Sequence, residues 1–312
     1  MRDAAFGYNP FTHMIGYGLV VHGGAGSPPA WKDGCAKAAA SSLAKLREGT
    51  GALEAAVSAA VALEDDGRFN AGSGSSLRLD GTTIEMDASV MDSRGGIGCV
   101  AAIQRVRNPV LVAREVMKSP HIVLSGEGAV GFARRCGFED YYKPSSHARE
   151  AYEAIRKALT DGRFEEMRDA WRNFDLRRHW NFPVSYEKIF AGCDTIGVVA
   201  LDRDGTLATA CSTGGASPML HGRVGDTPLV GCGFYAGAAA AVATTGIGEE
   251  IIRRMLARAV HDWIAQGEEV ARACERGVAS LPAEVPVGVI AISRRGAAIA
   301  ANRDMAAVSE AV

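Results

Sequence analysis

GCDTIGVVALDRDGTLATACSTGG, residues 192–215, is the stretch on which the interpretation of the whole chain depends. Its apolar run, 196–201, is typical of a buried strand, and Asp204-Gly205 supplies a hairpin turn into a second strand at 207–212. Such a hairpin would place the hydroxyls of Thr195 and Thr213 near the same end of two paired strands. We therefore expect both the chemistry and the maturation of the chain at this end.

Thr195 is the candidate nucleophile. A threonine hydroxyl is a poor nucleophile at ordinary pH and needs an adjacent base, and the nearest base available is its own α-amine. That amine, with a reference pKa of about 7.7 to 8.0, exists only after the bond between Asp194 and Thr195 is cut. The alternative interpretation is a β-branched residue that simply begins a strand, where threonines are common.

Composition limits the class of protein and its partners. The 312 residues are 47% hydrophobic, which is ample for a large core, and the net charge of −2 favours neither nucleic acid nor an anionic membrane. Seven scattered cysteines without a Cys-x-x-Cys pair suggest neither a zinc site nor a disulfide framework, so we expect a reducing cytoplasm. Residues 1–18 resemble neither a signal peptide nor a membrane span, and we interpret them as a short extension.

The first half of the chain mixes helix and strand patterns. Helices are predicted at 31–48, 52–64, 109–118 and 128–136, and strands at 19–22, 97–106 and 121–125. A hairpin turned at Asp80-Gly81 is predicted from 77–79 and 83–90. In its second arm the apolar residues alternate with Glu85, Asp87 and Ser89, which places one face on the core and one on polar groups.

Residues 141–194 differ in composition and are the best candidate for a linker. They are polar and contain one charged helical segment, 150–175, broken at Asp161-Gly162. Arginines and aromatics alternate over 163–182 as in some RNA-binding patches. Five arginines against four acidic residues leave a charge of only +1, so an amphipathic surface helix is the better interpretation.

The remainder of the chain is rich in strands. Strands are predicted at 196–201, 207–212, 229–234 and 239–244, then helices over 251–264 and 268–281, and two closing strands at 287–293 and 296–302. Strands, a helix pair and strands again favour an α+β fold with stacked sheets.

Seven motifs together resemble the plant-type asparaginase and isoaspartyl peptidase family of N-terminal nucleophile hydrolases, which is related to glycosylasparaginase. They are DTIG (194–197), STGG (212–215), GRVGD (222–226), TGIGE (245–249), HGGAG (22–26), FNAGSG (69–74) and EMDASVMD (85–92). The resemblance covers roughly residues 18–305. It implies a four-layer αββα sandwich in a single domain, residues 1–312, cut between Asp194 and Thr195 into an α subunit (1–194) and a β subunit (195–312).

The resemblance also implies roles for residues around Thr195. Thr213 would hold the nucleophile's side chain, and Asn70 would support its N-terminal group. Thr245 and Gly246 would form an oxyanion hole, which presents a hydroxyl and a backbone N–H to the attacked carbonyl oxygen. The simpler interpretations are a turn threonine at 213 and a helix N-cap at 245–246.

A second group of residues would bind the substrate. Arg223 and Asp226 lie three apart in a glycine-flanked loop, where a guanidinium can grip an α-carboxylate and a carboxylate can accept from an α-ammonium. Gly246 and Gly248 would line the same pocket. The alternative is a local ion pair between Arg223 and Asp226, which contributes little at a surface.

No cofactor is expected, but the resemblance implies a sodium-binding loop. Its ligands would be backbone carbonyls of Leu63, Glu64, Asp66, Phe69, Ala71 and Ser73, although no residue type there demands a cation. The glycines of HGGAG could suggest a phosphate loop, yet no Lys-Ser/Thr follows, so we interpret them as backbone that lies close to the scissile bond.

Two departures from the family bear on activity. Asp194 stands where plant-type members usually have glycine, with Cys193 before it, and Ala216-Ser217-Pro218-Met219 replaces the usual Met/Thr-Asn-Lys run. The predicted function is an autoprocessing hydrolase of β-aspartyl dipeptides and of the asparagine side-chain amide. The alternatives are cleavage of an N-glycan linkage, as in glycosylasparaginase, and a non-catalytic binding protein on the same fold. The expected partners are a substrate with free α-amino and α-carboxyl groups and a second αβ unit in a homodimer.

Overall fold

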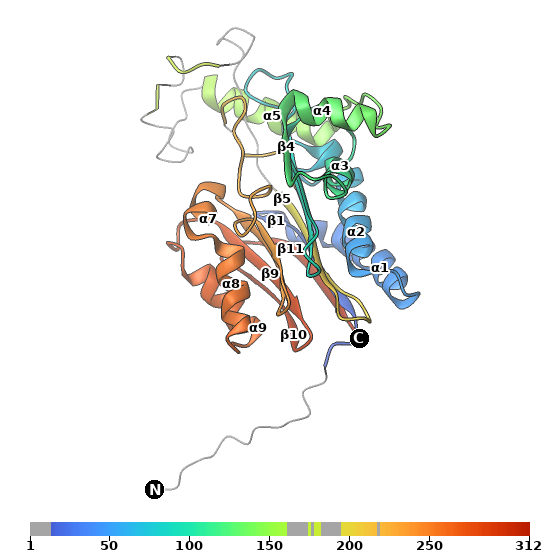
Figure 1. Ribbon diagram of the computed structural model, residues 1–312. Helices are drawn as coiled ribbons and strands as arrows, with labels where there is room; N and C mark the ends of the chain where they lie inside the picture. Colours follow the sequence, from blue (N-terminus) through green and yellow to red (C-terminus); the bar gives the residue numbers. More distant parts are fainter. Residues whose placement is uncertain (1–13, 161–173, 176–177, 182–194, 217–218) are drawn as a thin grey trace, which may run out of the picture.

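The computed structural model describes residues 14–160, 174–175, 178–181, 195–216 and 219–312, and it confirms a mixed α and β fold (Figure 1). The strands are β1 (Gly18–Ala25), β2 (Met86–Asp92), β3 (Ile97–Ile103), β4 (Val123–Ser125), β5 (Thr195–Leu201), β6 (Leu207–Thr213), β7 (Phe234–Ala236), β8 (Ala241–Gly246), β9 (Val287–Ser293), β10 (Gly296–Ala301) and β11 (Met305–Ala311). The helices are α1 (Lys32–Arg47), α2 (Ala52–Asp66), α3 (Pro109–Val116), α4 (Gly126–Arg135), α5 (Ser146–Thr160), α7 (Gly248–Arg254), α8 (Leu256–Ala265) and α9 (Val270–Ala279), with short 3₁₀ turns at Pro29–Trp31 and Gly72–Gly74.

The strands form a seven-stranded sheet in the order β11-β1-β5-β6-β2-β3-β4 and a four-stranded sheet in the order β10-β9-β8-β7. The pairs are antiparallel except β3 with β4, which is parallel. The predicted hairpin of β5 and β6 is confirmed and lies at the centre of the larger sheet. Thr195 stands directly opposite Thr213, and Thr213 stands opposite Asp87 of β2, so the three residues form one cross-strand row.

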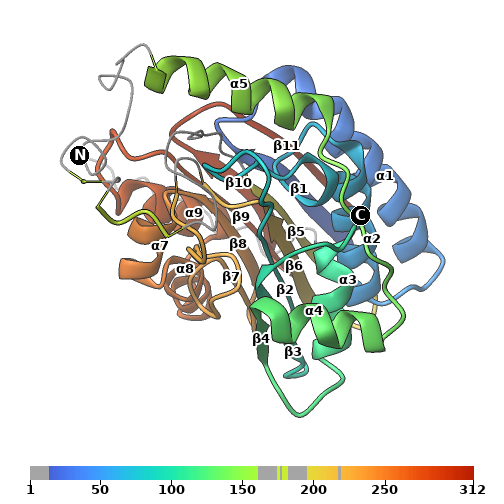
Figure 2. The same cartoon turned by 90° about the horizontal axis from the view of Figure 1, so that it is seen from above.

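Helices cover the outer faces of the two sheets, which face each other (Figures 1 and 2). α1 packs on β1 and β11, α2 on β5 and β6, and α3 on β2 and β3, while α8 and α9 pack on the smaller sheet. β5 and β6 contact β8 of the opposite sheet. None of the helices among the described residues is long and apolar enough to cross a membrane.

The alternation along β5 shows why its sequence is a continuous apolar run. Ile196 and Val198 belong to the apolar cluster beneath the helices, whereas Val199 and Leu201 belong to the cluster between the sheets. A strand buried on both faces needs apolar residues at every position. Full burial of each such side chain stabilises the fold by roughly 1.5–3 kcal/mol, which fixes the register of the hairpin and hence the position of Thr195.

The predicted hairpin of 77–79 with 83–90 was wrong. Asp80 and Gly81 do form a turn, and the Arg78 N–H donates to the Thr83 carbonyl at 2.7 Å, but the first arm is not a strand. Two carboxylate oxygens of Asp80 are occupied instead by the N–H and hydroxyl groups of Thr82 and Thr83. β2 pairs with β3 and β6 of the large sheet, because those strands offer a longer ladder than an isolated hairpin.

The C-terminal half departs from the sequence prediction in three places. A strand over 229–234 is wrong, since only Phe234–Ala236 is a strand there, and β11 was not predicted. The single helix over 251–264 is divided at Met255, whose φ of 46° lies in the left-handed region. The division separates α7, beside the pocket described below, from α8, which packs on β7 and β8.

Part of the predicted linker lies outside the described residues. The helical segment predicted from residue 150 corresponds to α5, and its continuation through 161–173 is not described. Most of the arginine-rich and aromatic stretch 163–182, residues 182–194 before Thr195, and residues 1–13 of the predicted extension also lie outside.

Candidate active site

The hydroxyls of Thr195 and Thr213 meet at one end of the β5–β6 hairpin. Their oxygens are 3.0 Å apart, which is hydrogen-bond distance. The Thr213 oxygen also accepts the backbone N–H of Gly215 at 3.0 Å. The Thr213 hydroxyl can therefore donate its proton to the Thr195 oxygen, and its predicted role in holding the Thr195 side chain stays a prediction.

A cavity of about 130 Å³ opens beside Thr195. It is lined by Ala25, Thr195, Thr213, Gly215, Ala216, Arg223, Gly225, Asp226, Thr227, Thr245, Gly246, Ile247, Gly248 and Pro286. A water molecule occupies about 30 Å³ in the liquid, so the cavity suits a small ligand of amino-acid size. The cavity brings together seven of the predicted residues from strands, helix and loop: Thr195, Thr213, Arg223, Asp226, Thr245, Gly246 and Gly248.

Thr245, at the end of β8, presents its hydroxyl to this cavity. Its oxygen accepts the backbone N–H of Ala25 at 3.1 Å, so the hydroxyl proton is available to donate elsewhere. Gly246 follows with a φ of +139°, and a Cβ there would lie 2.2 Å from the Pro286 carbonyl oxygen. Only glycine fits at 246, because the left-handed φ and the close contact with Pro286 both exclude a side chain.

Asn70 supports the segment that follows Thr213. Its side-chain amide donates to the Gly215 carbonyl at 2.7 Å, and its carbonyl oxygen accepts the Ser76 N–H at 2.8 Å. Its backbone carbonyl accepts the Gly214 N–H at 2.8 Å. Asn70 therefore anchors the backbone beside the two hydroxyls, and its predicted role at the N-terminal group of Thr195 stays a prediction.

Arg223 reaches the cavity through a glycine cradle. A Cβ on Gly225 would lie 2.7 Å from one terminal nitrogen of the guanidinium, and a Cβ on Gly248 would lie 2.8 Å from the other. The guanidinium donates to both carboxylate oxygens of Glu249 at 3.0 Å. The alternative of a simple ion pair with Asp226 is therefore not what the structure shows, since the hydrogen-bonded partner of Arg223 is Glu249.

Asp226 is a buried carboxylate at the floor of the cavity. Its side chain accepts a weak hydrogen bond from the Thr244 hydroxyl at 3.4 Å, and its Oδ1 would lie 2.9 Å from a Cβ on Gly248. Burial raises its pKa to about 6, an effect opposed by the positive charge of Arg223. Since this value lies below neutral pH, the cavity contains a buried negative charge at pH 7.

Two contributions to the site were missed by the sequence analysis. Glu249 is the last residue of the TGIGE motif. An acidic residue directly after Gly248 could have indicated a partner for Arg223. Ala25, the fourth residue of HGGAG, lines the same cavity as Thr195, and the closeness of this backbone to the scissile bond stays a prediction. Asp194 and Cys193, on the other side of the predicted scissile bond, lie outside the described residues.

The predicted sodium loop folds back on the end of α2. Glu64 and Ser73 are joined by a 2.7 Å hydrogen bond from the Ser73 hydroxyl to the Glu64 carbonyl. The carbonyls of Phe69, Ala71 and Ser73 accept the N–H groups of Ala71, Gly74 and Ser145. Each carbonyl keeps a second lone pair, and oxygen ligands suit a hard cation, so the residues fit sodium and the site stays a prediction.

Comparison with known proteins gives one consistent result. The family model described as asparaginase matches residues 15–312. A plant-type L-asparaginase of Pyrococcus furiosus is 38% identical over 272 residues, covering 83% of each chain. Isoaspartyl peptidase/L-asparaginases of Danio rerio and Homo sapiens are 39% and 38% identical over 89% of this chain and cover 86% and 87% of their own lengths. This chain therefore belongs to the asparaginase family.

Proposed function

We propose that the protein is an autoprocessing amidohydrolase that cleaves β-aspartyl dipeptides and the side-chain amide of L-asparagine. The observation that carries the proposal is the cavity in which two hydrogen-bonded threonine hydroxyls face an arginine and a buried aspartate. Arg223 and Asp226 would hold the α-carboxylate and α-ammonium of the substrate. The β-carbonyl would then lie over Thr195. The names of the relatives support both substrates.

The chemistry needs the α-amine that cleavage of the bond between Asp194 and Thr195 would release. Thr195 Oγ attacks the β-carbonyl carbon, and its proton passes to that amine. Thr245 and Gly246 stabilise the negative carbonyl oxygen. Collapse of the tetrahedral adduct expels ammonia or an amino acid, which takes the proton. Water then attacks the resulting ester and the amine accepts its proton; the ester C–Oγ bond breaks, aspartate leaves, and the amine returns the proton to Thr195 Oγ.

The proposal extends to the assembly. The helix-covered sheets would be the four-layer αββα sandwich of N-terminal nucleophile hydrolases, and residues 1–194 and 195–312 would stay associated after the cut. We also propose a homodimer of such αβ units, a sodium ion in the loop at the end of α2, and a cytoplasmic location, which an odd number of scattered cysteines favours.

A substrate panel tests the proposal. β-Aspartyl-leucine and asparagine should be hydrolysed by the wild-type protein, and Thr195→Ala should lower the rate by about 10⁴-fold or more, as expected when the nucleophile is removed. Thr195→Ser is the control, because it keeps a hydroxyl and the amine. Preference for a glycosyl-asparagine would favour the N-glycan linkage instead. Wild-type protein without turnover on any of the three would favour a binding protein.

A further inference from the structure

One polar face in the molecule is not used by the chemistry described so far. Glu85, directly before β2, and Asp87 and Ser89 within β2 alternate along the chain and so share one face. Their exposed fractions are only 2%, 3% and 0%. Buried polar groups of this kind require partners, and the identity of the partners indicates what the face does.

Each of the three residues has one partner in a single segment, residues 222–227, which carries Arg223 and Asp226, and Glu85 also pairs with Arg78 and His221 and Asp87 with the Ala102 N–H. Glu85 Oε2 accepts the Gly222 N–H at 2.9 Å, Asp87 Oδ2 accepts the Gly225 N–H at 3.3 Å, and the Ser89 hydroxyl donates to the Thr227 carbonyl at 2.7 Å. Three successive positions on the strand face thus bind the segment at three points, residues 222, 225 and 227.

These bonds matter because the segment has no ladder of its own. Residues 222–227 belong to neither a helix nor a strand. The bonded groups flank the two charged residues: Arg223 lies between the first two contacts, and Asp226 lies between the last two. Side chains of β2 and of the residue before it therefore supply the support that regular secondary structure supplies elsewhere.

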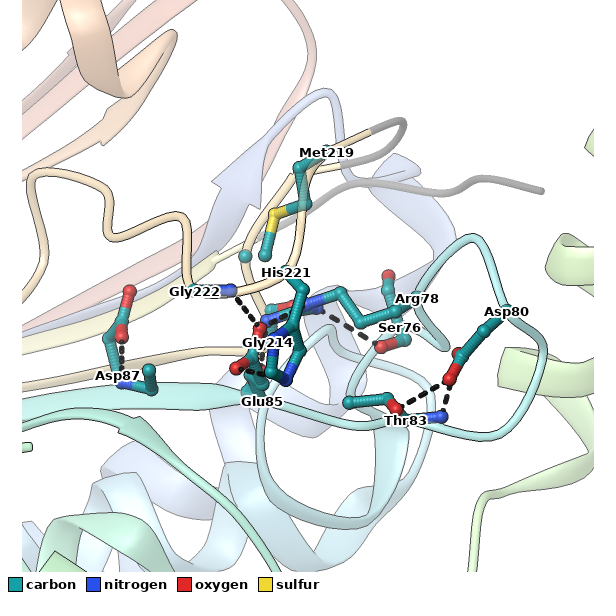
Figure 3. A network of polar contacts seen from close by, with 12 residues as sticks. Ser76, Arg78, Asp80, Thr83, Glu85, Asp87, Gly214, Met219, His221 and Gly222 are labelled. Atoms are coloured by element: carbon teal, nitrogen blue, oxygen red, sulfur yellow. Dashed lines mark hydrogen bonds and ion pairs between the residues drawn. The ribbon is translucent and has the colours of Figure 1, made fainter. Parts of the chain in front are cut away.

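The same strand is fixed relative to the nucleophile. Asp87 stands opposite Thr213 in the ladder, and Thr213 stands opposite Thr195. Glu85 also pairs with the buried Arg78, whose guanidinium donates to the Gly214 carbonyl at 2.6 Å (Figure 3). β2 therefore holds both the segment with the charged residues and the segment that follows Thr213.

We infer that Glu85, Asp87 and Ser89 are positioning residues, which set the place of the substrate's α-amino and α-carboxyl groups relative to Thr195. They act through Arg223 and Asp226 and line no part of the cavity. The inference rests on the proposed function, because it assigns the two charged residues to the substrate's head group.

Asp87 offers the cleanest test. Each of its carboxylate oxygens accepts a backbone N–H, one from Ala102 at 2.8 Å and one from Gly225. In Asp87→Asn one oxygen becomes an NH₂ group. This group cannot accept a hydrogen bond, so one of the two backbone N–H groups loses its acceptor. A matched control is Asp202→Asn, since Asp202 is 5% exposed and its two oxygens accept the N–H groups of Ala52 at 3.0 Å and Thr206 at 2.8 Å, beyond the far end of the β5–β6 hairpin.

The experiment compares KM and kcat for β-aspartyl-leucine, and the inhibition constant of aspartate, in both variants after cleavage has been measured by mass. Loss of one charge-assisted hydrogen bond predicts that Asp87→Asn raises KM and the aspartate inhibition constant about tenfold, with kcat changed by less than about threefold. Asp202→Asn should lower the melting temperature comparably but leave KM at the wild-type value. If both variants keep wild-type KM and aspartate affinity, the inference is overturned.

A milder variant covers the case in which Asp87→Asn does not fold or is not cut. Ser89→Ala removes only the hydroxyl bound to the Thr227 carbonyl, and it should raise KM about threefold. An unchanged KM in Ser89→Ala would then refute the inference. Failure of the wild-type protein to hydrolyse any β-aspartyl substrate would refute the proposed function instead, so the two failures are distinguishable.

Discussion

The threonine hydroxyls and the charged residues of the site are held in different ways. Thr195, Thr213 and Thr245 lie at strand ends, where the main-chain ladder of the sheets sets their positions. Arg223 and Asp226 lie in a segment without secondary structure, which is bound by the buried side chains of Glu85 and of Asp87 in β2. Damage to the strand ends should therefore lower kcat, whereas damage around the loop should raise KM.

The largest effect among the following tests is expected for Thr245→Val. Removal of one oxyanion-hole donor typically costs about 10²–10³ in kcat. KM should change little, because the head-group residues are untouched. Thr245→Ser is the control, since it keeps the hydroxyl that accepts the Ala25 N–H. Steady-state kinetics on β-aspartyl-leucine would check this, and a Thr245→Val enzyme with wild-type kcat would contradict the role.

Gly248→Ala should disturb the positions of Arg223 and Asp226 and so affect substrate binding. The added Cβ would lie 2.8 Å from the Arg223 guanidinium and 2.9 Å from an Asp226 carboxylate oxygen, so at least one charged group must move. A displacement near 1 Å is enough to weaken substrate binding by about tenfold or more. KM should rise more than kcat falls.

The control for this variant is Gly128→Ala in α4, where an added Cβ meets no atom within 4 Å. It should leave kinetics unchanged and stabilise the helix slightly. Equal kinetics for Gly248→Ala and Gly128→Ala would show that the cradle does not shape the site.

Aspartate affinity should depend on pH through Asp226. Because burial raises its pKa to about 6 from the ordinary 3.8, its carboxylate is protonated below about pH 6 and can no longer pair with an α-ammonium. The dissociation constant of aspartate should rise by about tenfold per pH unit below that value. Calorimetric titrations between pH 4.5 and 8 would measure it. Constant affinity down to pH 5 would contradict the assignment.

The smallest effect on activity is expected behind the hairpin, at Glu64. This carboxyl is fully buried in α2, and burial raises its pKa to about 8 from 4.5. The folded state therefore holds the proton more tightly than the unfolded state. The resulting stabilisation is complete below pH 4.5 and is lost as pH rises through 8.

Glu64→Gln should remove this dependence while leaving turnover unchanged. Between pH 5 and pH 9 the melting temperature of the wild-type protein should fall by about 2 °C or more beyond that of Glu64→Gln. If the melting temperatures of the two proteins changed equally with pH, Glu64 would not titrate in this range.

The two regions also differ in how far the sequence predicts them. The hairpin was predictable because an apolar run, an Asp-Gly turn and a second run leave one register that buries both faces. The pairing of Thr195 with Thr213 follows from that register. Gly246, in the expected oxyanion hole, and Gly248, in the expected substrate pocket, were likewise visible in the sequence.

The supports of the loop were not predictable, because each depends on a tertiary contact. The alternation of Glu85, Asp87 and Ser89 showed a polar face but not that residues 222–227 bind it, some 138 positions away in the chain. The bidentate contact of Arg223 with Glu249 is likewise a tertiary contact that the sequence does not reveal. Met255 gave no signal of a helix break, since a left-handed φ is uncommon for a methionine.

The central claim is that a cut before Thr195 creates the active enzyme. Purified precursor of 32.7 kDa should be followed by intact mass and by β-aspartyl-leucine hydrolysis in the same time course. We predict that turnover rises in proportion to a fragment whose N-terminal sequence begins at Thr195. Full turnover by the uncut chain would contradict the account.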